Sequence, residues 1–174
     1  MDGLSIIVGN ACSLLAMVTD SVSSTRKTAK GVLMVQSLSQ LIYCIGAIVL
    51  QGYSAAVQNA VSIVRNILAM RKLDNKVVQW ALVALGVVLG LVFNNLGWIG
   101  LLPVIANFQY TLAVFRFSDN ERALKVSFAL AVFLFGIFNL AIMNLVGFVT
   151  NLVVAVTTVV YLIRTRKQTQ EEEK

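Results

Sequence analysis

The chain of 174 residues is 58% hydrophobic and only 13% charged, and its mean hydropathy is +0.82. A chain this short cannot bury so much apolar surface in a water-soluble core, so the composition excludes an ordinary soluble domain and indicates a membrane protein. The net charge of +6 does not indicate nucleic-acid binding, because Lys and Arg occur in small clusters between apolar segments.

The first apolar segment follows Met1-Asp2-Gly3, which lacks the basic n-region of a cleaved signal peptide, so we expect it to remain as a membrane helix. Six more segments also reach the roughly 17 apolar residues that a spanning helix needs. The seven segments are approximately 3–19, 31–50, 54–70, 76–94, 97–116, 122–139 and 144–164. The breaks at 51–53 and 140–144 are the weakest, and reading either pair of runs as one long helix would change the count.

The basic residues fall on alternate connections between these segments. One side receives all 14 of them, namely Arg26, Lys27, Lys30, Arg65, Arg71, Lys72, Lys76, Arg116, Arg122, Lys125, Arg164, Arg166, Lys167 and Lys174. The other side carries Asp2, Gln51, Asn94, Asn95 and Asn144. Because basic connections stay in the cytoplasm, we expect a multi-pass protein with a periplasmic N-terminus and a cytoplasmic C-terminus.

The chain repeats a weak pattern at an offset of 92 residues. Gln58-Asn59 lies near the start of an apolar segment that ends in basic residues, and Thr150-Asn151 lies near the start of another such segment 92 residues later. Lys30 and Arg122 are separated by the same offset. The pattern predicts an all-α membrane protein with two parallel three-helix bundles, residues 1–72 and 97–167. A linker helix at 73–96 joins them, and a polar tail occupies 168–174.

Two features of these helices leave alternatives open. In the linker, Gly86 and Gly90 form a GxxxG pattern, which serves either close packing against a bundle or a homo-oligomer interface. Arg65 lies some depth inside the third segment and either extends to the cytoplasmic face or acts as a gate or anion contact. Pro103 predicts a kink in the fifth segment that could serve as a hinge.

Polar side chains inside the apolar helices are the candidate site. Asn59, Ser62 and Asn66 share one face of the third segment. The other candidates lie on four further segments: Asn10, Gln40, Asn107, Asn151 and Thr158. Such groups either hold helices together through hydrogen bonds or line a solute site. The duplication would set Asn59 and Asn151 across a two-fold axis, where facing amides suit a small neutral polar solute.

The residue types argue against catalysis. Histidine is absent, and Cys12 and Cys44 both fall inside apolar segments, so we expect no metal site and no cofactor. No phosphate loop, nucleophile–base pair or carboxylate pair occurs, and we therefore expect no enzyme activity. No Asp or Glu lies well inside a predicted segment, which favours a passive facilitator over an ion-coupled carrier.

The arrangement of three, one and three helices, with Asn59 and Asn151 on the third and seventh, resembles the SWEET, PQ-loop and Pnu-type transporters. That resemblance implies a sugar- or nucleoside-like solute bound by the two asparagines. The chain departs from SWEET proteins because it has no Pro-Gln dipeptide and only one proline, Pro103.

The whole chain also resembles the YgjV-type family of bacterial inner-membrane proteins, in Ile7-Val8-Gly9-Asn10, the Ser-rich loop through Arg26-Lys27 and the helix bearing Gln58-Asn59. This resemblance implies a location in the bacterial inner membrane. We therefore expect a small-solute facilitator in the lipid bilayer. The alternative is a membrane protein without transport activity that binds another membrane protein or a lipid.

Overall fold

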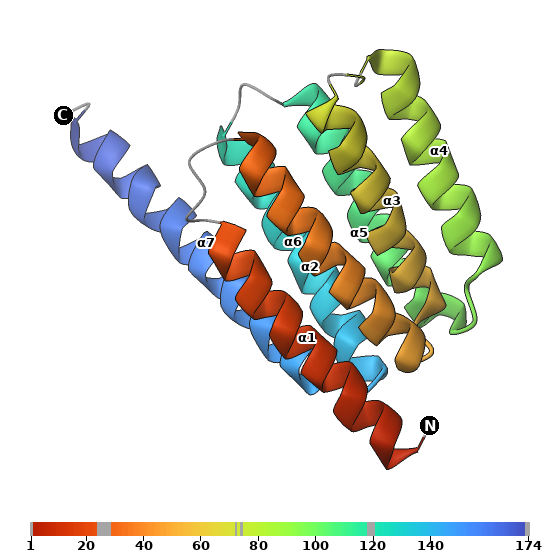
Figure 1. Ribbon diagram of the computed structural model, residues 1–174. Coiled ribbons are helices and arrows are strands. Elements are labelled where there is room, and N and C mark those ends of the chain that lie inside the picture. Colours follow the sequence, from red (N-terminus) through yellow and green to blue (C-terminus); the bar gives the residue numbers. More distant parts are fainter. Residues whose placement is uncertain (1, 24–28, 72, 74, 118–120, 173–174) are drawn as a thin grey trace.

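The computed structural model describes residues 2–23, 29–71, 73, 75–117 and 121–172, and within these ranges it contains helices and no strand (Figure 1). The helices are α1 (Gly3–Ser23), α2 (Ala29–Val49), α3 (Tyr53–Met70), α4 (Lys76–Val92), α5 (Gly97–Arg116), α6 (Glu121–Ala141) and α7 (Leu145–Glu172). The all-α prediction is confirmed, with one helix over each predicted segment. Helix α7 continues beyond its predicted end into the polar tail.

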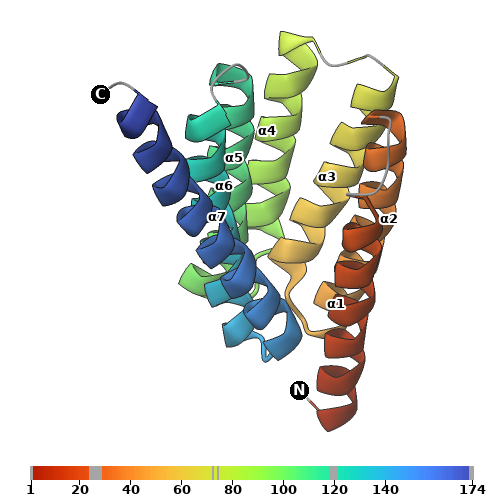
Figure 2. The same cartoon turned by 90° about the vertical axis from the view of Figure 1, so that its left-hand side faces the viewer.

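The helices form two consecutive sets that meet along two junctions. In one set α2 packs between α1 and α3, and in the other α6 packs between α5 and α7. The sets contact each other where α3 meets α5 and where α1 meets α7. Helix α4 lies against α3 and α5 and so covers the first junction. Figure 2 shows the two sets diverging toward the end where α7 finishes.

Basic residues mark that diverging end, which we call the basic end. Lys30, Arg71, Lys76 and Arg122 lie there at the ends of α2, α3, α4 and α6. The opposite end, which we call the turn end, holds the α2–α3 and α6–α7 turns. Arg26, Lys27, Lys72 and Lys174, which belong to the predicted basic clusters, lie outside the described residues.

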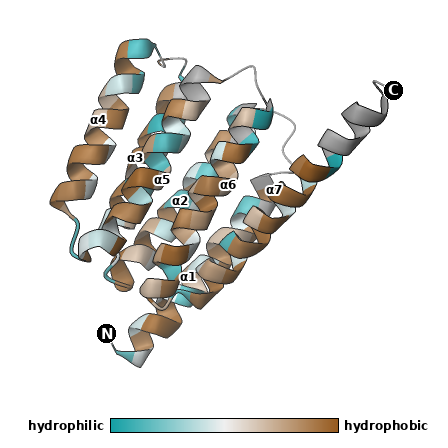
Figure 3. Ribbon diagram, turned by 180° about the vertical axis from the view of Figure 1, so that it is seen from behind, coloured by the Kyte–Doolittle hydropathy of each residue, from teal (hydrophilic) through white to brown (hydrophobic). Residues whose placement is uncertain are grey.

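Burial is inverted relative to a soluble protein. The buried apolar residues are mostly alanine, and fully or nearly buried positions include Ser39, Ser54 and Gln58. Large apolar side chains are exposed on every helix, and Trp98 is 87% exposed. Hydrophobic residues occupy most of the described length of the helices (Figure 3). Small and polar residues therefore bring the helices together, as in proteins whose outer surface faces lipid.

By length and composition alone, two helices contain a window long and apolar enough to cross a bilayer. These windows are Gly3–Asp20 in α1 and Leu145–Arg164 in α7. Shorter apolar stretches occupy Leu33–Val49, Lys76–Val92 and Lys125–Ala141.

The backbone repeats at the same offset of 92 residues as the sequence. Helix α2 spans Ala29–Val49 and α6 spans Glu121–Ala141, so both boundaries coincide at this offset. Two residues beyond the end of each helix lies a residue with positive φ, Gln51 at 56° and Met143 at 60°. These two residues are themselves 92 apart.

The turn hydrogen bonds repeat as well. Gly52 N donates to Ala47 O at 2.7 Å, and its equivalent Asn144 N donates to Asn139 O at 2.8 Å. Together with the bonds from Gln51 N and Met143 N, they form a Schellman motif at the end of each helix. Two stretches with little sequence identity thus adopt the same helix–turn–helix.

An asparagine from outside the set binds each turn. Asn95 Nδ2 donates to Gln51 O at 2.8 Å, and Asn10 Nδ2 donates to Met143 O at 2.9 Å. Asn10 Oδ1 also accepts from Val146 N at 2.9 Å, at the start of α7. We call these two contacts the amide clasps. They join the sets at the turn end, where Phe138 of α6 also packs among Ala47, Leu50, Ala55 and Ala56.

The left-handed turns lead to a stability prediction. A side chain with a Cβ is disfavoured at positive φ, so Gln51→Gly and Met143→Gly should each stabilise the protein by about 0.5–1 kcal/mol. Gln51→Ala is the matched control, because it removes the same side chain but keeps the Cβ, and it should leave stability nearly unchanged. The measurement is the unfolding midpoint in mild detergent, and equal midpoints for the Gly and Ala variants would contradict the assignment.

Candidate functional site

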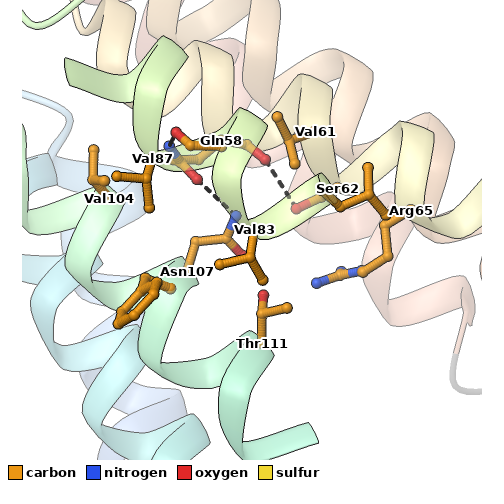
Figure 4. A pocket seen from close by; sticks show the side chains of 12 residues that line it. Gln58, Val61, Ser62, Arg65, Val83, Val87, Val104, Asn107 and Thr111 are labelled. Atoms are coloured by element: carbon orange, nitrogen blue, oxygen red, sulfur yellow. Dashed lines mark hydrogen bonds between the residues drawn. The ribbon is translucent and has the colours of Figure 1, made fainter. Parts of the chain in front are cut away.

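A small polar cavity lies at the junction of α3, α4 and α5 (Figure 4). Its volume is about 20 Å³, which is room for one water molecule. The polar side chains that line it are Gln58, Ser62, Arg65, Asn107 and Thr111. The apolar wall is formed by valines, Leu82 and Phe108. The cavity therefore has a polar interior, and α4, which belongs to neither set, forms one of its walls.

Gln58 is the centre of the hydrogen bonds at this cavity. Its Nε2 donates to Gly86 O of α4 at 2.8 Å, and its Oε1 accepts from Asn107 Nδ2 of α5 at 2.7 Å. The Ser62 hydroxyl donates to the Gln58 backbone carbonyl at 2.9 Å. The Gln58 side chain is 2% exposed, so one buried amide connects three helices.

The GxxxG pattern of α4 makes room for this amide. A Cβ on Gly90 would lie 2.6 Å from Gln58 Nε2 and 2.6 Å from a methyl carbon of Val104. Gly86 also faces Gln58, with a slightly wider spacing of 3.4 Å. The two glycines thus serve the packing of the linker against α3 and α5, which is one of the two roles open to them from the sequence.

Three of the predicted site residues, Ser62, Arg65 and Asn107, line this cavity. The predicted hinge Pro103 is fully buried inside α5, which runs through it from Gly97 to Arg116. Asn66 shares a face of α3 with Ser62 and is 3% exposed.

Several predicted amides have no hydrogen-bond partner among the described residues. Asn59, Asn66 and Asn151 form none there, and Gln40 Oε1 is buried without a donor. Asn59 and Asn151 are half-buried, and α3 and α7 do not contact each other within the described ranges. Asn151 lies against α6 instead, close to Gly136. The structure therefore does not bring Asn59 and Asn151 together.

The other predicted polar residues have local partners. Asn10 is used in an amide clasp, and the Thr158 hydroxyl donates to Val154 O of its own helix at 2.7 Å. Asp20, a boundary residue in the sequence, lies within α1 and accepts a hydrogen bond from the buried Ser39 of α2.

Sequence reasoning did not select Gln58, Thr111 or Asn95 as site residues. The GxxxG pattern indicated that the linker packs closely against other helices, but it does not show which side chain lies opposite the glycines. Asn95 was seen only as a polar residue of the connection before α5. Its partner is a backbone carbonyl, which carries no sequence signal.

Comparison with known proteins gives a family but no characterised relative. The family model Imp-YgjV, described as "Bacterial inner membrane protein", matches residues 7–169. No curated protein and no solved structure matches the chain.

The close approach of α4 leads to a second prediction. Gly90→Ala places a methyl group against Gln58 and Val104 in a packed junction, so it should destabilise the protein by about 1–3 kcal/mol. Gly3→Ala is the matched control, since a Cβ at Gly3 has nothing within 4 Å, and it should change stability by less than about 0.5 kcal/mol. Unfolding midpoints in detergent measure both, and a Gly90→Ala protein as stable as wild type would contradict this packing.

Proposed function

The chain belongs to the Imp-YgjV family of bacterial inner membrane proteins, and from this premise we propose that it is a facilitator of a small, neutral, polar solute. The proposed protein crosses the membrane seven times, as two parallel three-helix bundles and a linker helix. Its N-terminus is periplasmic and its C-terminus cytoplasmic. It is not an enzyme.

The inverted burial supports seven spans. Helices α2 to α6 expose large apolar side chains, although within the described residues only α1 and α7 contain an apolar window long enough to cross a bilayer. The hydropathy of α3 is lowered by Gln58, Ser62 and Asn66, and all three are buried. Polar groups on the inside and apolar groups on the outside are what a spanning helix in a bundle requires.

The single observation that supports transport is that Asn59, Asn66 and Asn151 have amide side chains without a hydrogen-bond partner among the described residues. Asn59 and Asn151 are half-buried, so their free amide groups are open to water or to a ligand that completes their hydrogen bonds. Asn59 and Asn151 are equivalent in the two halves, and each offers a donor and an acceptor. A neutral polyol or nucleoside has matching groups and needs no counter-charge.

The asymmetry between the two ends supports alternating access. Amide clasps join the two sets at the turn end, and the sets diverge toward the basic end (Figure 2). In the proposed cycle the structure is the state in which the clasps hold the turn end together. Rocking of one set against the other would break the clasps and open the turn end.

The transport test uses protein reconstituted in vesicles, with a solute first selected by thermal shift from a panel of neutral sugars and nucleosides. We expect Asn59→Ala and Asn151→Ala each to reduce uptake at least about tenfold, because each removes hydrogen bonds to a desolvated solute. Thr157→Val is the matched control, since this exposed hydroxyl bonds only to its own helix. It should transport normally.

Normal uptake by the Asn59→Ala, Asn151→Ala double variant would reject the proposed site. If no solute on the panel binds or crosses the vesicle, the alternative of a protein- or lipid-binding membrane protein is favoured. In that case the amides serve helix packing, and their removal should lower stability rather than transport.

The orientation is tested separately by single cysteines in a protein without Cys12 and Cys44. Trp98 is 87% exposed at the start of α5, and Lys76 is exposed at the start of α4. In intact cells with a permeable outer membrane, an impermeant thiol reagent should label Trp98→Cys directly and Lys76→Cys only after lysis. Labelling of both from one side would contradict the topology.

A further inference from the structure

A cation without a counter-ion lies in the cavity under α4. Arg65 is half-buried, and its guanidinium group points toward Thr111 (Figure 4). No Asp or Glu lines the cavity, and Arg65 has no ion pair within the described part of the chain. A guanidinium group removed from water without a partner is costly, so this position favours an anion beside it.

The other polar groups of the cavity leave mostly donors free. The Gln58 and Asn107 amides each use one N–H in the bonds described above, and each keeps a second. Thr111 makes no hydrogen bond to the described residues, so its hydroxyl can donate. The Ser62 hydroxyl donates to a backbone carbonyl, and Asn107 Oδ1 is the main acceptor that remains. One positive charge and several free donors suit an anion better than a neutral solute.

The cavity volume restricts the size of this anion. About 20 Å³ holds one water molecule or one ion of similar size. Sulfate, phosphate and carboxylates are larger and would require α4 to move away from α3. We propose that the α3–α4–α5 cavity binds a single monatomic anion of the chloride class, held by Arg65 and Thr111.

Such an anion would stabilise the docking of the linker. Arg65 belongs to α3, Thr111 to α5, and Gly86 and Val83 of α4 close the cavity. An anion at this point neutralises the only charged side chain that lines it. The site is independent of the proposed solute site, so its presence does not depend on whether the protein transports a neutral solute.

The experiment measures the unfolding midpoint of purified protein in phospholipid-free detergent, in sodium chloride and in sodium gluconate at equal concentration. Wild type should be more stable in chloride, because gluconate is too large for the cavity. Arg65→Gln should lose this difference. Arg71→Gln is the matched control, since it removes an exposed arginine from the end of the same helix, and it should keep the difference.

Chloride binding is measured directly by the line width of ³⁵Cl in solution with the protein. We expect broadening with wild type, reversal by bromide, and an apparent affinity about three- to tenfold weaker in Thr111→Val, which loses one donor. This readout keeps the proposal testable if Arg65→Gln does not fold.

Equal wild-type midpoints in the two salts, or an equal salt effect in Arg65→Gln, would overturn the proposal. So would stabilisation by added phosphatidylglycerol that depends on Arg65 while chloride has no effect, because the partner of Arg65 would then be a lipid phosphate.

Discussion

The relation between the two helix sets depends on a hydrogen bond from an asparagine to a backbone carbonyl, made twice. In each set the middle helix is followed by a left-handed residue, Gln51 or Met143, whose carbonyl accepts a hydrogen bond from an asparagine outside that set. These carbonyls lie beyond the helix ends and accept from Asn95 of the α4–α5 connection and from Asn10 of α1. The two bonds therefore link the sets near the contacts of α3 with α5 and of α1 with α7.

The two junctions share a backbone arrangement but not a chemistry. At the α3–α5 junction Gln58 contacts Asn107, and α4 covers both. At the α1–α7 junction the equivalent of Gln58 is Thr150, whose hydroxyl donates to Met17 Sδ at 3.2 Å. The linker can cover only one junction, since it connects α3 to α5. The polar cavity at the α3–α5 junction therefore includes a wall from α4 that the α1–α7 junction does not share.

Polar groups inside the bundle fall into two classes with different consequences. The paired ones, such as Gln58 and Ser39, tie helices together, as interhelical hydrogen bonds do in apolar surroundings. Others, Asn59, Asn66 and Asn151, have no hydrogen-bond partner among the described residues. A protein that binds its ligand through the interior has a physical reason to keep such groups, because the ligand supplies the missing hydrogen bonds.

The sequence by itself determined the helices, their approximate ends and the offset of 92 residues, because apolar length, breaks and charge clusters are local properties of the chain. It also identified Ser62, Arg65 and Asn107 as polar residues inside apolar helices. Only the tertiary structure decided which of them meet. Asn10 looked equivalent to the other amides, yet it binds a backbone turn, and Gln58 rather than Asn59 faces α4 and α5. Neighbouring residues on a helix point about 100° apart, so the sequence does not show whether Gln58 or Asn59 faces α4 and α5. Every residue has the same backbone carbonyl, so the sequence does not show which one Asn10 binds.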